Sequence, residues 1–238
     1  MTRVGLLAPM QLELAPLRRR LSLRRVRKER TLYIGTIGAV EIVATVTGIG
    51  TAAATAATEW LLRETRIDHV MVVGIAGGID AKRPVGALIA PEVVVNGTTG
   101  SEYRPVQLGE LPPHGRLVTW DRLLTSLEEA AELARSGVVG LDMETAAIAA
   151  VCERRGCPWS VFRAISDRVT DETTDSAVLA LAGPDGSGNP WAVARYLLAR
   201  PWRIVRLMRL ARGSLRAANA AADAAIRACG RLGGIGAQ

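Results

Sequence analysis

GLDMETAAIAAVC (residues 140–152) and FRAISDRVTDE (residues 162–172) are the two most informative stretches of this chain. In the first, Asp142 and Glu144 fall at the first turn of a predicted helix whose apolar residues recur at helical spacing. Free N–H groups and the helix dipole stabilise carboxylates at such an end. The pair could therefore bind hydroxyl groups or could merely cap the helix, and the spacing by itself favours the cap.

The second stretch begins in a buried strand predicted over residues 160–165, which places Ser166 and Asp167 at the carboxyl end of that strand. Open α/β sheets bind their ligands at this end of their strands. Other apolar runs predict strands at 3–8, 32–35, 40–46, 70–73, 85–90, 92–95, 117–121 and 138–141. Helices are predicted from about residue 10, from within the segment 47–55 to about 66, and over 126–135, whereas 96–115 is predicted to be loop.

Composition indicates a globular protein with one domain, or one domain and an appendage: 238 residues, 49% hydrophobic and 22% charged. The three cysteines have neither metal-ligand nor disulfide-framework spacing, which favours a reducing compartment and predicts no metal site. Neither a signal-peptide pattern nor an apolar run of about 18 residues is visible. We therefore expect a cytoplasmic location.

The net charge of +7 is concentrated in two segments. Residues 18–30 hold eight basic residues and one acid, and residues 191–231 hold nine arginines and one acid. No nucleic-acid-binding motif accompanies either segment, so no nucleic-acid partner is predicted. The segments are interpreted as solvated surfaces or as faces toward an anionic membrane.

Two glycine-rich segments could bring the backbone close to a ligand. Gly48 and Gly50 begin a match to the dinucleotide-binding fingerprint, but the acid at the expected spacing, Asp68, precedes the next strand instead of ending it, which argues against that function. The run VMVVGIAGGI (residues 70–79) predicts a buried strand that enters a glycine-rich turn. This turn could present N–H groups to a ligand or could simply join two strands.

DMETAAIAAVC and FRAISD, taken with VGLLAPMQLEL near the start and VVGIAGGI in the middle, resemble the nucleoside phosphorylase/nucleosidase superfamily. The resemblance is strongest to its methylthioadenosine/S-adenosylhomocysteine nucleosidase branch and spans residues 4–172 in the family's order. It implies an α/β fold, a three-layer αβα sandwich with a central mixed sheet. We expect this catalytic domain over residues 1–180, and a basic helical C-terminal extension packed on or beside it over residues 181–238.

The resemblance implies cleavage of the N-glycosidic bond of a purine nucleoside, with a 5′-modified adenosine as the expected small-molecule substrate. Asp167 would be the general acid at purine N7, oriented by Ser166, and its position at a buried strand end favours the protonated form. Glu144 would accept hydrogen bonds from the ribose hydroxyls beside Asp142, and Met143 would pack under the sugar. Glu13 matches the acid that activates the attacking water in the nucleosidases, although at this sequence position it could equally be a solvated helix residue.

The resemblance also implies the walls of the substrate pocket. The predicted pocket residues are Gly48, Ile49, Gly50, Ile75, Ala76, Gly77, Gly78 and Leu123. Leu123 stands where the family has an aromatic residue that stacks on the base, next to Asp121 at an acidic position of the family.

The sequence leaves hydrolysis and phosphorolysis open but favours hydrolysis. Superfamily phosphorylases bind phosphate with an arginine and a serine, and this chain has Val72 and Ile75 at those positions. Without them a phosphate dianion lacks its charge-assisted hydrogen bonds. Ile75 also replaces the serine of the nucleosidases, so neither pattern is intact. No cofactor is expected, and phosphate would be a co-substrate only for a phosphorylase.

The tail predicts two amphipathic helices, over residues 191–200 and 202–228, after a loop at 184–188. Its arginines recur at helical spacing from Arg203 to Arg216, which permits peripheral membrane contact or a solvated face. The tail further resembles the hopanoid-associated phosphorylase branch, which implies an adenosylated triterpenoid substrate. Members of the superfamily usually form homodimers or larger homo-oligomers. A nucleoside-binding or membrane-peripheral protein without catalysis is the alternative outside the enzymes.

Overall fold

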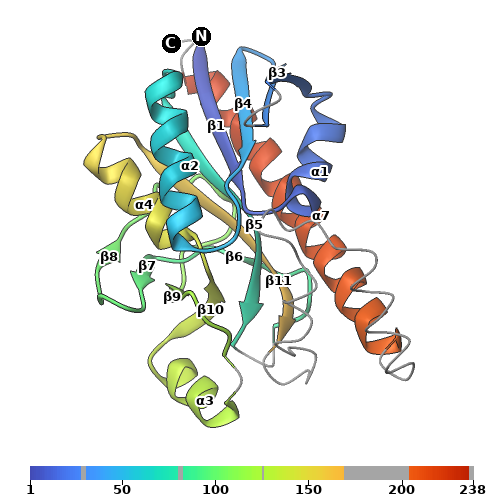
Figure 1. Cartoon of the computed structure of the whole chain (residues 1–238), viewed down its shortest axis with the longest axis vertical. Coiled ribbons are helices and arrows are strands. Elements are labelled where there is room, and N and C mark those ends of the chain that lie inside the picture. Colours follow the sequence, from blue (N-terminus) through green and yellow to red (C-terminus); the bar gives the residue numbers. More distant parts are fainter. Residues whose placement is uncertain (28–30, 80–82, 125, 169–203, 236–238) are drawn as a thin grey trace.

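The computed structural model describes residues 1–27, 31–79, 83–124, 126–168 and 204–235 (Figure 1). The tail segments predicted at 184–188 and 191–200 lie outside these residues. The described chain forms one mixed sheet of 11 strands with five helices. Their order is β1 (Thr2–Ala8), α1 (Gln11–Arg20), β2 (Arg24–Arg27), β3 (Leu32–Ile37), β4 (Val40–Val46), α2 (Thr51–Glu64), β5 (His69–Gly78), β6 (Leu88–Ile89), β7 (Val93–Asn96), β8 (Glu102–Tyr103), β9 (Arg116–Thr119), α3 (Leu127–Arg135), β10 (Val138–Asp142), α4 (Thr145–Arg154), β11 (Trp159–Arg168) and α7 (Ile204–Ile235).

The sheet consists of two parallel blocks, β4-β1-β5-β11 and β10-β9-β7, which meet antiparallel at β5 and β10, and antiparallel strands lie at its two ends. The strand order is β2-β3-β4-β1-β5-β10-β9-β7-β8, and β11 pairs with both β5 and β6. Strands β4, β1, β5 and β11 run in one direction, so their carboxyl ends lie at the same edge of the sheet. The end of β10 passes antiparallel to the end of β5, where Leu141 pairs with Gly77. Five strand ends therefore lie close together, namely the carboxyl ends of β1, β4, β5, β10 and β11.

Two hydrophobic layers sandwich the sheet and confirm the predicted αβα architecture. Helices α1 and α7 cover one face, and α2 and α4 cover the other (Figure 1). Successive side chains of the central strands point to opposite faces of the sheet and pack into different layers. Leu6 packs on the α1/α7 side and Leu7 on the α2/α4 side, and both are fully buried. Burial on both faces explains why these strands are continuous apolar runs in the sequence.

Helix α7 contributes an alanine face to the core. Ala217, Ala221, Ala225 and Ala228 are fully buried against β11, β5 and α1, because side chains this small let the helix lie close to the sheet. The predicted division between residues 180 and 181 lies outside the described residues and stays a prediction.

The structure corrects several local predictions. The run 70–79 holds no glycine-rich turn, because β5 continues through Gly74 and Gly77 to Gly78 and pairs with β10 and β11 along this part. Asp142 ends strand β10 and Glu144 is the N-cap residue of α4, so neither lies in the first helical turn. The sequence also missed two short antiparallel strands, β2 in the first basic segment and β8 in the predicted loop.

Candidate active site

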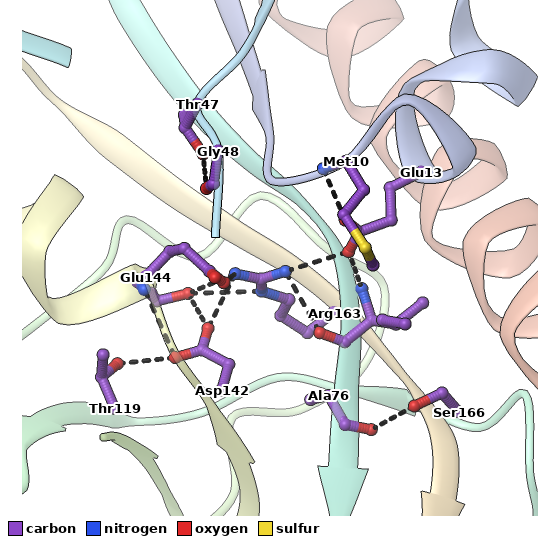
Figure 2. Close-up of polar contacts among 12 residues, drawn as sticks. Met10, Glu13, Thr47, Gly48, Ala76, Thr119, Asp142, Glu144, Arg163 and Ser166 are labelled. Carbon is purple, nitrogen blue, oxygen red and sulfur yellow. Dashed lines mark hydrogen bonds and ion pairs between the residues drawn. The ribbon is translucent and has the colours of Figure 1, made fainter. Parts of the chain in front are cut away.

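A fully buried arginine, Arg163, lies at the centre of the site (Figure 2). It projects from β11, and its guanidinium is surrounded by three carboxylates from separate parts of the chain. Its Nη1 lies 3.4 Å from Glu13 Oε1, and its Nη2 lies 2.8 Å from Asp142 Oδ2 and 3.1 Å from Glu144 Oε2. Nη1 also donates to the Ile75 carbonyl, at 3.1 Å. A buried charge requires such pairing, so Arg163 fixes where these acids can be.

Glu13 reaches the site because α1 starts at the carboxyl end of β1. Its Oε2 accepts a hydrogen bond from the Met10 N–H at 2.9 Å, which closes the side chain back onto the start of its own helix. Its Oε1 accepts from the Ile75 N–H of β5 at 2.8 Å. Glu13 is 1% exposed, so it is a buried group of the site and the solvated alternative is wrong.

Asp142 and Glu144 flank the β10–α4 junction and have different surroundings. Asp142 Oδ1 accepts from the Thr119 hydroxyl at 2.6 Å and from the Thr145 N–H at 3.3 Å, and Oδ2 accepts from the Thr145 hydroxyl and from Arg163. Both of its oxygens are thus engaged within the protein. Glu144 Oε1 accepts from the Gly50 N–H at 3.0 Å, which ties the loop before α2 to the same centre.

Burial changes the ionisation of two of the acids. It raises the pKa of the Glu13 carboxyl to about 8, against the opposing effect of Arg163 and with a further rise from Glu144. Burial likewise raises the pKa of the Glu144 carboxyl to about 7; Arg163 lowers that pKa and Asp142 raises it. Both groups can therefore exchange a proton near neutral pH.

Gly74 provides the space in which Glu13 and Arg163 meet. A Cβ atom at this position would collide with the Glu13 carboxylate and lie 2.5 Å from Arg163 Nη1. The absence of a side chain at Gly74 leaves room for the buried carboxylate and guanidinium to pack together. Gly74 does not form the turn that the sequence suggested.

A cavity of about 190 Å³ opens beside this cluster. It brings together the three acids Glu13, Glu144 and Asp167, which are far apart in the sequence. The other sequence-predicted residues that line it are Asp142, Met143, Ser166, Ile49, Ile75, Ala76, Gly77 and Leu123. Residues that the sequence did not indicate complete the lining: Pro9, Met10, Arg122, Leu124 and Leu141.

Three predicted pocket residues do not line the cavity. Gly50 acts through its N–H bond to Glu144, and its φ of 94° is a conformation that favours glycine. Gly48, with φ 86°, accepts the Thr47 hydroxyl on its carbonyl at 2.9 Å. Gly78 lies in β5, where a Cβ atom would come within 2.9 Å of the Ile165 side chain.

Ser166 and Asp167 project into the cavity from an irregularity in β11. Ile165 pairs with Ala76 and Asp167 with Gly77, so Ser166 is an extra residue between successive pairs. Such a bulge redirects the side chains next to it. The Ser166 hydroxyl has one proton to donate, and its Oγ lies 2.5 Å from Asp167 Oδ1 and 3.3 Å from the Ala76 carbonyl oxygen. The shorter contact connects the predicted orienting residue to the predicted acid.

Sequence reasoning did not identify Arg163, although it quoted the FRAISD motif that contains this residue. The signal was an arginine inside an otherwise apolar strand. Arginine is almost never fully buried unless it is paired, so this position required nearby carboxylates. Among the described residues, no group of His, Cys, Asp and Glu side chains forms a candidate metal site.

Comparison with known proteins places the chain in a family. A sequence model described as the phosphorylase superfamily matches residues 3–132 and 106–184, which together cover most of the chain.

Solved structures share the fold at low identity. A 5′-methylthioadenosine/S-adenosylhomocysteine nucleosidase mutant of Helicobacter pylori, with 5′-methylthioadenosine in its active site, has a TM-score of 0.74 at 15% identity, over 98% of this chain and 100% of that chain. Futalosine hydrolase of the same organism has a TM-score of 0.72 at 15% identity, over 97% and 98%. The nucleosidase of Colwellia psychrerythraea with adenine has 0.70 at 21% identity, over 97% and 96%. At these identities the likeness shows the fold alone.

The packing of Gly74 predicts a selective loss of stability. We expect Gly74→Ala to lower the free energy of unfolding by roughly 1–3 kcal/mol, because the added methyl displaces the buried charged groups. Gly77→Ala in the same strand is the control, since its Cβ would lie 3.9 Å from the nearest atom, the Leu141 carbonyl oxygen. Urea unfolding measures both, and equal losses for the two variants would contradict this explanation of Gly74.

Proposed function

Because this chain belongs to the phosphorylase superfamily, we propose that it is a nucleosidase that hydrolyses the N-glycosidic bond of a purine nucleoside. The observation that carries the proposal is the convergence of Glu13, Glu144 and Asp167 on one cavity. Breaking this bond requires a proton for the leaving base, a hold on the sugar, and a nucleophile on the opposite face of the sugar. Three acids at one cavity can supply these needs, by analogy with the paired carboxylates of sugar hydrolysis.

In the proposed reaction Asp167 donates a proton to purine N7 while the C1′–N bond breaks and its electron pair leaves with the base. Ser166 orients Asp167 through their hydrogen bond. A water molecule then adds to C1′ and loses a proton to Glu13, which yields free base and free sugar. Protonation of the leaving group and activation of water are general acid and general base steps, so Asp167 must start protonated and Glu13 must start ionised.

Glu144 is the proposed partner of the ribose hydroxyls, with Met143 under the sugar. The Gly50 N–H and Arg163 fix the two oxygens of Glu144, so the carboxylate is already oriented before substrate binds. The part of Asp142 in ribose binding is indirect, because Thr119, Thr145 and Arg163 engage both of its oxygens. Asp142 holds Arg163 and the start of α4 in place.

The charges at the cavity support water as the nucleophile. Arg163, the buried cation nearest to the acids, is already paired with three carboxylates. Arg122, the cation that lines the cavity, is itself paired with Glu129. A phosphate dianion would therefore have to displace an existing ion pair and approach the remaining acids, which like-charge repulsion opposes. Phosphorolysis of the same nucleoside, or of an adenosylated lipid, is the second candidate, and phosphate dependence distinguishes it.

Apolar residues along the rest of the cavity support a 5′-modified adenosine as the substrate. Pro9, Met10, Ile49 and Leu141 offer little to a charged or hydroxylated substituent and favour an apolar or thioether group. Leu123 and Leu124 provide an apolar wall without an aromatic ring, which supports contact with a base by dispersion.

Two proposals concern partners. The first is a homodimer or larger assembly, which sedimentation velocity would measure.

The second is that the exposed half of α7 lies on an anionic membrane. In this half Met208 and Leu215 are 46% and 49% exposed, and Arg209, Arg212 and Arg216 are also exposed. Co-sedimentation with anionic but not neutral vesicles tests this, and equal recovery with both would reject it. Among the described helices, none has the length and apolar character needed to cross a bilayer.

Substrate turnover without phosphate tests hydrolysis. We expect the protein to release adenine and 5-methylthioribose from 5′-methylthioadenosine in phosphate-free buffer, at a rate that added phosphate does not increase. Chromatography of the products measures both. A requirement for phosphate, with a sugar 1-phosphate as product, would reverse the assignment. Asp167→Asn is the inactive reference, because it keeps the shape of the side chain but removes the acid.

The raised pKa of Glu13 predicts the pH dependence. A carboxyl with a pKa of about 8 is protonated below that pH, so a base at this position gains activity as pH rises. We expect kcat/KM to increase toward about pH 8, and Glu13→Gln to lose this rise together with a factor of about 10²–10⁴ in rate. The surface acid Glu59, whose side chain is 44% exposed, is the control when replaced by Gln and should keep the parent profile. An unchanged rise in Glu13→Gln would exclude Glu13 as the base.

A further inference from the structure

Helix α7 contacts the end of β11, from which Ser166 and Asp167 line the cavity. Gly213 is the point of contact: a Cβ atom there would lie 2.5 Å from the Ser166 carbonyl oxygen and 3.3 Å from Val85 Cγ1. A backbone carbonyl moves only together with the segment that carries it, whereas the end of a flexible side chain can move aside alone. Glycine at this position therefore allows α7 to come as close to β11 as it does.

The strand segment that Gly213 touches is the bulge that carries the proposed acid. Ser166 lies between the Ala76 carbonyl oxygen, which is 3.3 Å from its Oγ, and α7 on the other side. Asp167 follows directly, and its carboxylate accepts the Ser166 hydroxyl. The position of the Ser166 backbone therefore determines where the Asp167 side chain points.

A second contact of α7 lies one helical turn further on. The side chain of Arg216 packs over Gly86, where a Cβ atom would lie 3.0 Å from Arg216 Cγ and Cδ. The Gly86 N–H donates to the Ile165 carbonyl at 2.7 Å, immediately before the bulge. Helix α7 thus contacts the Ser166 bulge directly through Gly213. It also contacts Gly86, which is hydrogen-bonded to the residue before the bulge, through Arg216.

We propose that α7 is a positioning element of the active site, in which Gly213 seats the helix against the Ser166 bulge and thereby aims Asp167 at the leaving base. This inference rests on the proposed function for the role of Asp167. It assigns to the C-terminal helix a part in leaving-group protonation, and Gly213 is a positioning residue because it acts only through Ser166.

Gly213→Ala tests the proposal, with Gly230→Ala as the matched control on the same helix. Alanine improves helix propensity at both sites, but a Cβ at Gly230 would have no other atom within 4 Å. Two substrates separate leaving-group protonation from other steps: 5′-methylthioadenosine, whose base needs a proton, and 4-nitrophenyl 5-methylthioriboside, whose nitrophenolate leaves without one. Asp167→Asn is the reference for a missing acid.

We expect Gly213→Ala to lower kcat for the adenosine substrate by about 10–100-fold with KM nearly unchanged, because a displacement of about 1 Å has effects of this size. The nitrophenyl substrate should lose less than about threefold, as for Asp167→Asn, and Gly230→Ala should retain both activities. Crystal structures of the two alanine variants should show the Ser166 carbonyl displaced only in Gly213→Ala.

Equal losses on both substrates would overturn the proposal, as would an undisplaced Ser166 in Gly213→Ala. If the parent protein turned over neither substrate, the proposed function would fail. In that case the two crystal structures would still decide whether Gly213 seats the bulge. If Gly213→Ala does not fold, Arg216→Ala adds no atom and should lower kcat for the adenosine substrate by about threefold while leaving kcat for the nitrophenyl substrate unchanged. A loss that does not depend on the leaving group would overturn the proposal there as well.

Discussion

The burial of Arg163 is the constraint on which the rest of the site depends. A guanidinium inside an apolar strand is tolerated only where carboxylates and carbonyl oxygens surround it. This structure supplies them from the start of α1, the end of β10, the N-cap of α4 and the middle of β5. One buried cation thereby joins elements from both sides of the sheet. It places their acids within reach of one cavity (Figure 2).

The same arrangement raises the pKa values of buried acids, and its contribution to stability falls as pH rises. Three carboxylates share one cation, and burial raises the pKa values of Glu13 and Glu144 into the neutral range. The native state therefore holds protons that the unfolded chain has already released. The contribution of these groups to stability falls between the ordinary carboxyl range and about pH 8, as linkage requires. Groups that can exchange protons near neutral pH are suited to acid and base catalysis.

Much of the fold was predictable because its signals are local. Continuous apolar runs predicted β1, β4, β5 and β11. The resemblance to the nucleosidase family implied a shared site for Glu13, Glu144 and Asp167, and all three line one cavity. Short antiparallel pairs such as β2 with β3 were missed because a charged edge strand lacks an apolar pattern.

The remaining features depend on contacts between distant residues. Gly74 looked like part of a turn, but its absent side chain makes room for Glu13 and Arg163, which are far away in the sequence. The need for glycine at position 213 likewise becomes apparent only from the Ser166 carbonyl, which leaves no room for a Cβ atom there. Arg163 offered a usable signal, since a lone arginine in a buried strand implies partners, but its sequence neighbours do not show which acids they are.

The most direct test of this account is the stability of Arg163→Met at pH 5 and pH 8, measured by urea unfolding beside Arg154→Met. Arg154 pairs with Glu59 on the surface, with side chains 58% and 44% exposed, so its loss should cost less than about 1 kcal/mol. Arg163→Met should lose about 3–5 kcal/mol at pH 8, where the buried carboxylates ionise without a cation, and distinctly less at pH 5, where they stay protonated. Small losses for both variants, unchanged between the two pH values, would contradict the central role of Arg163.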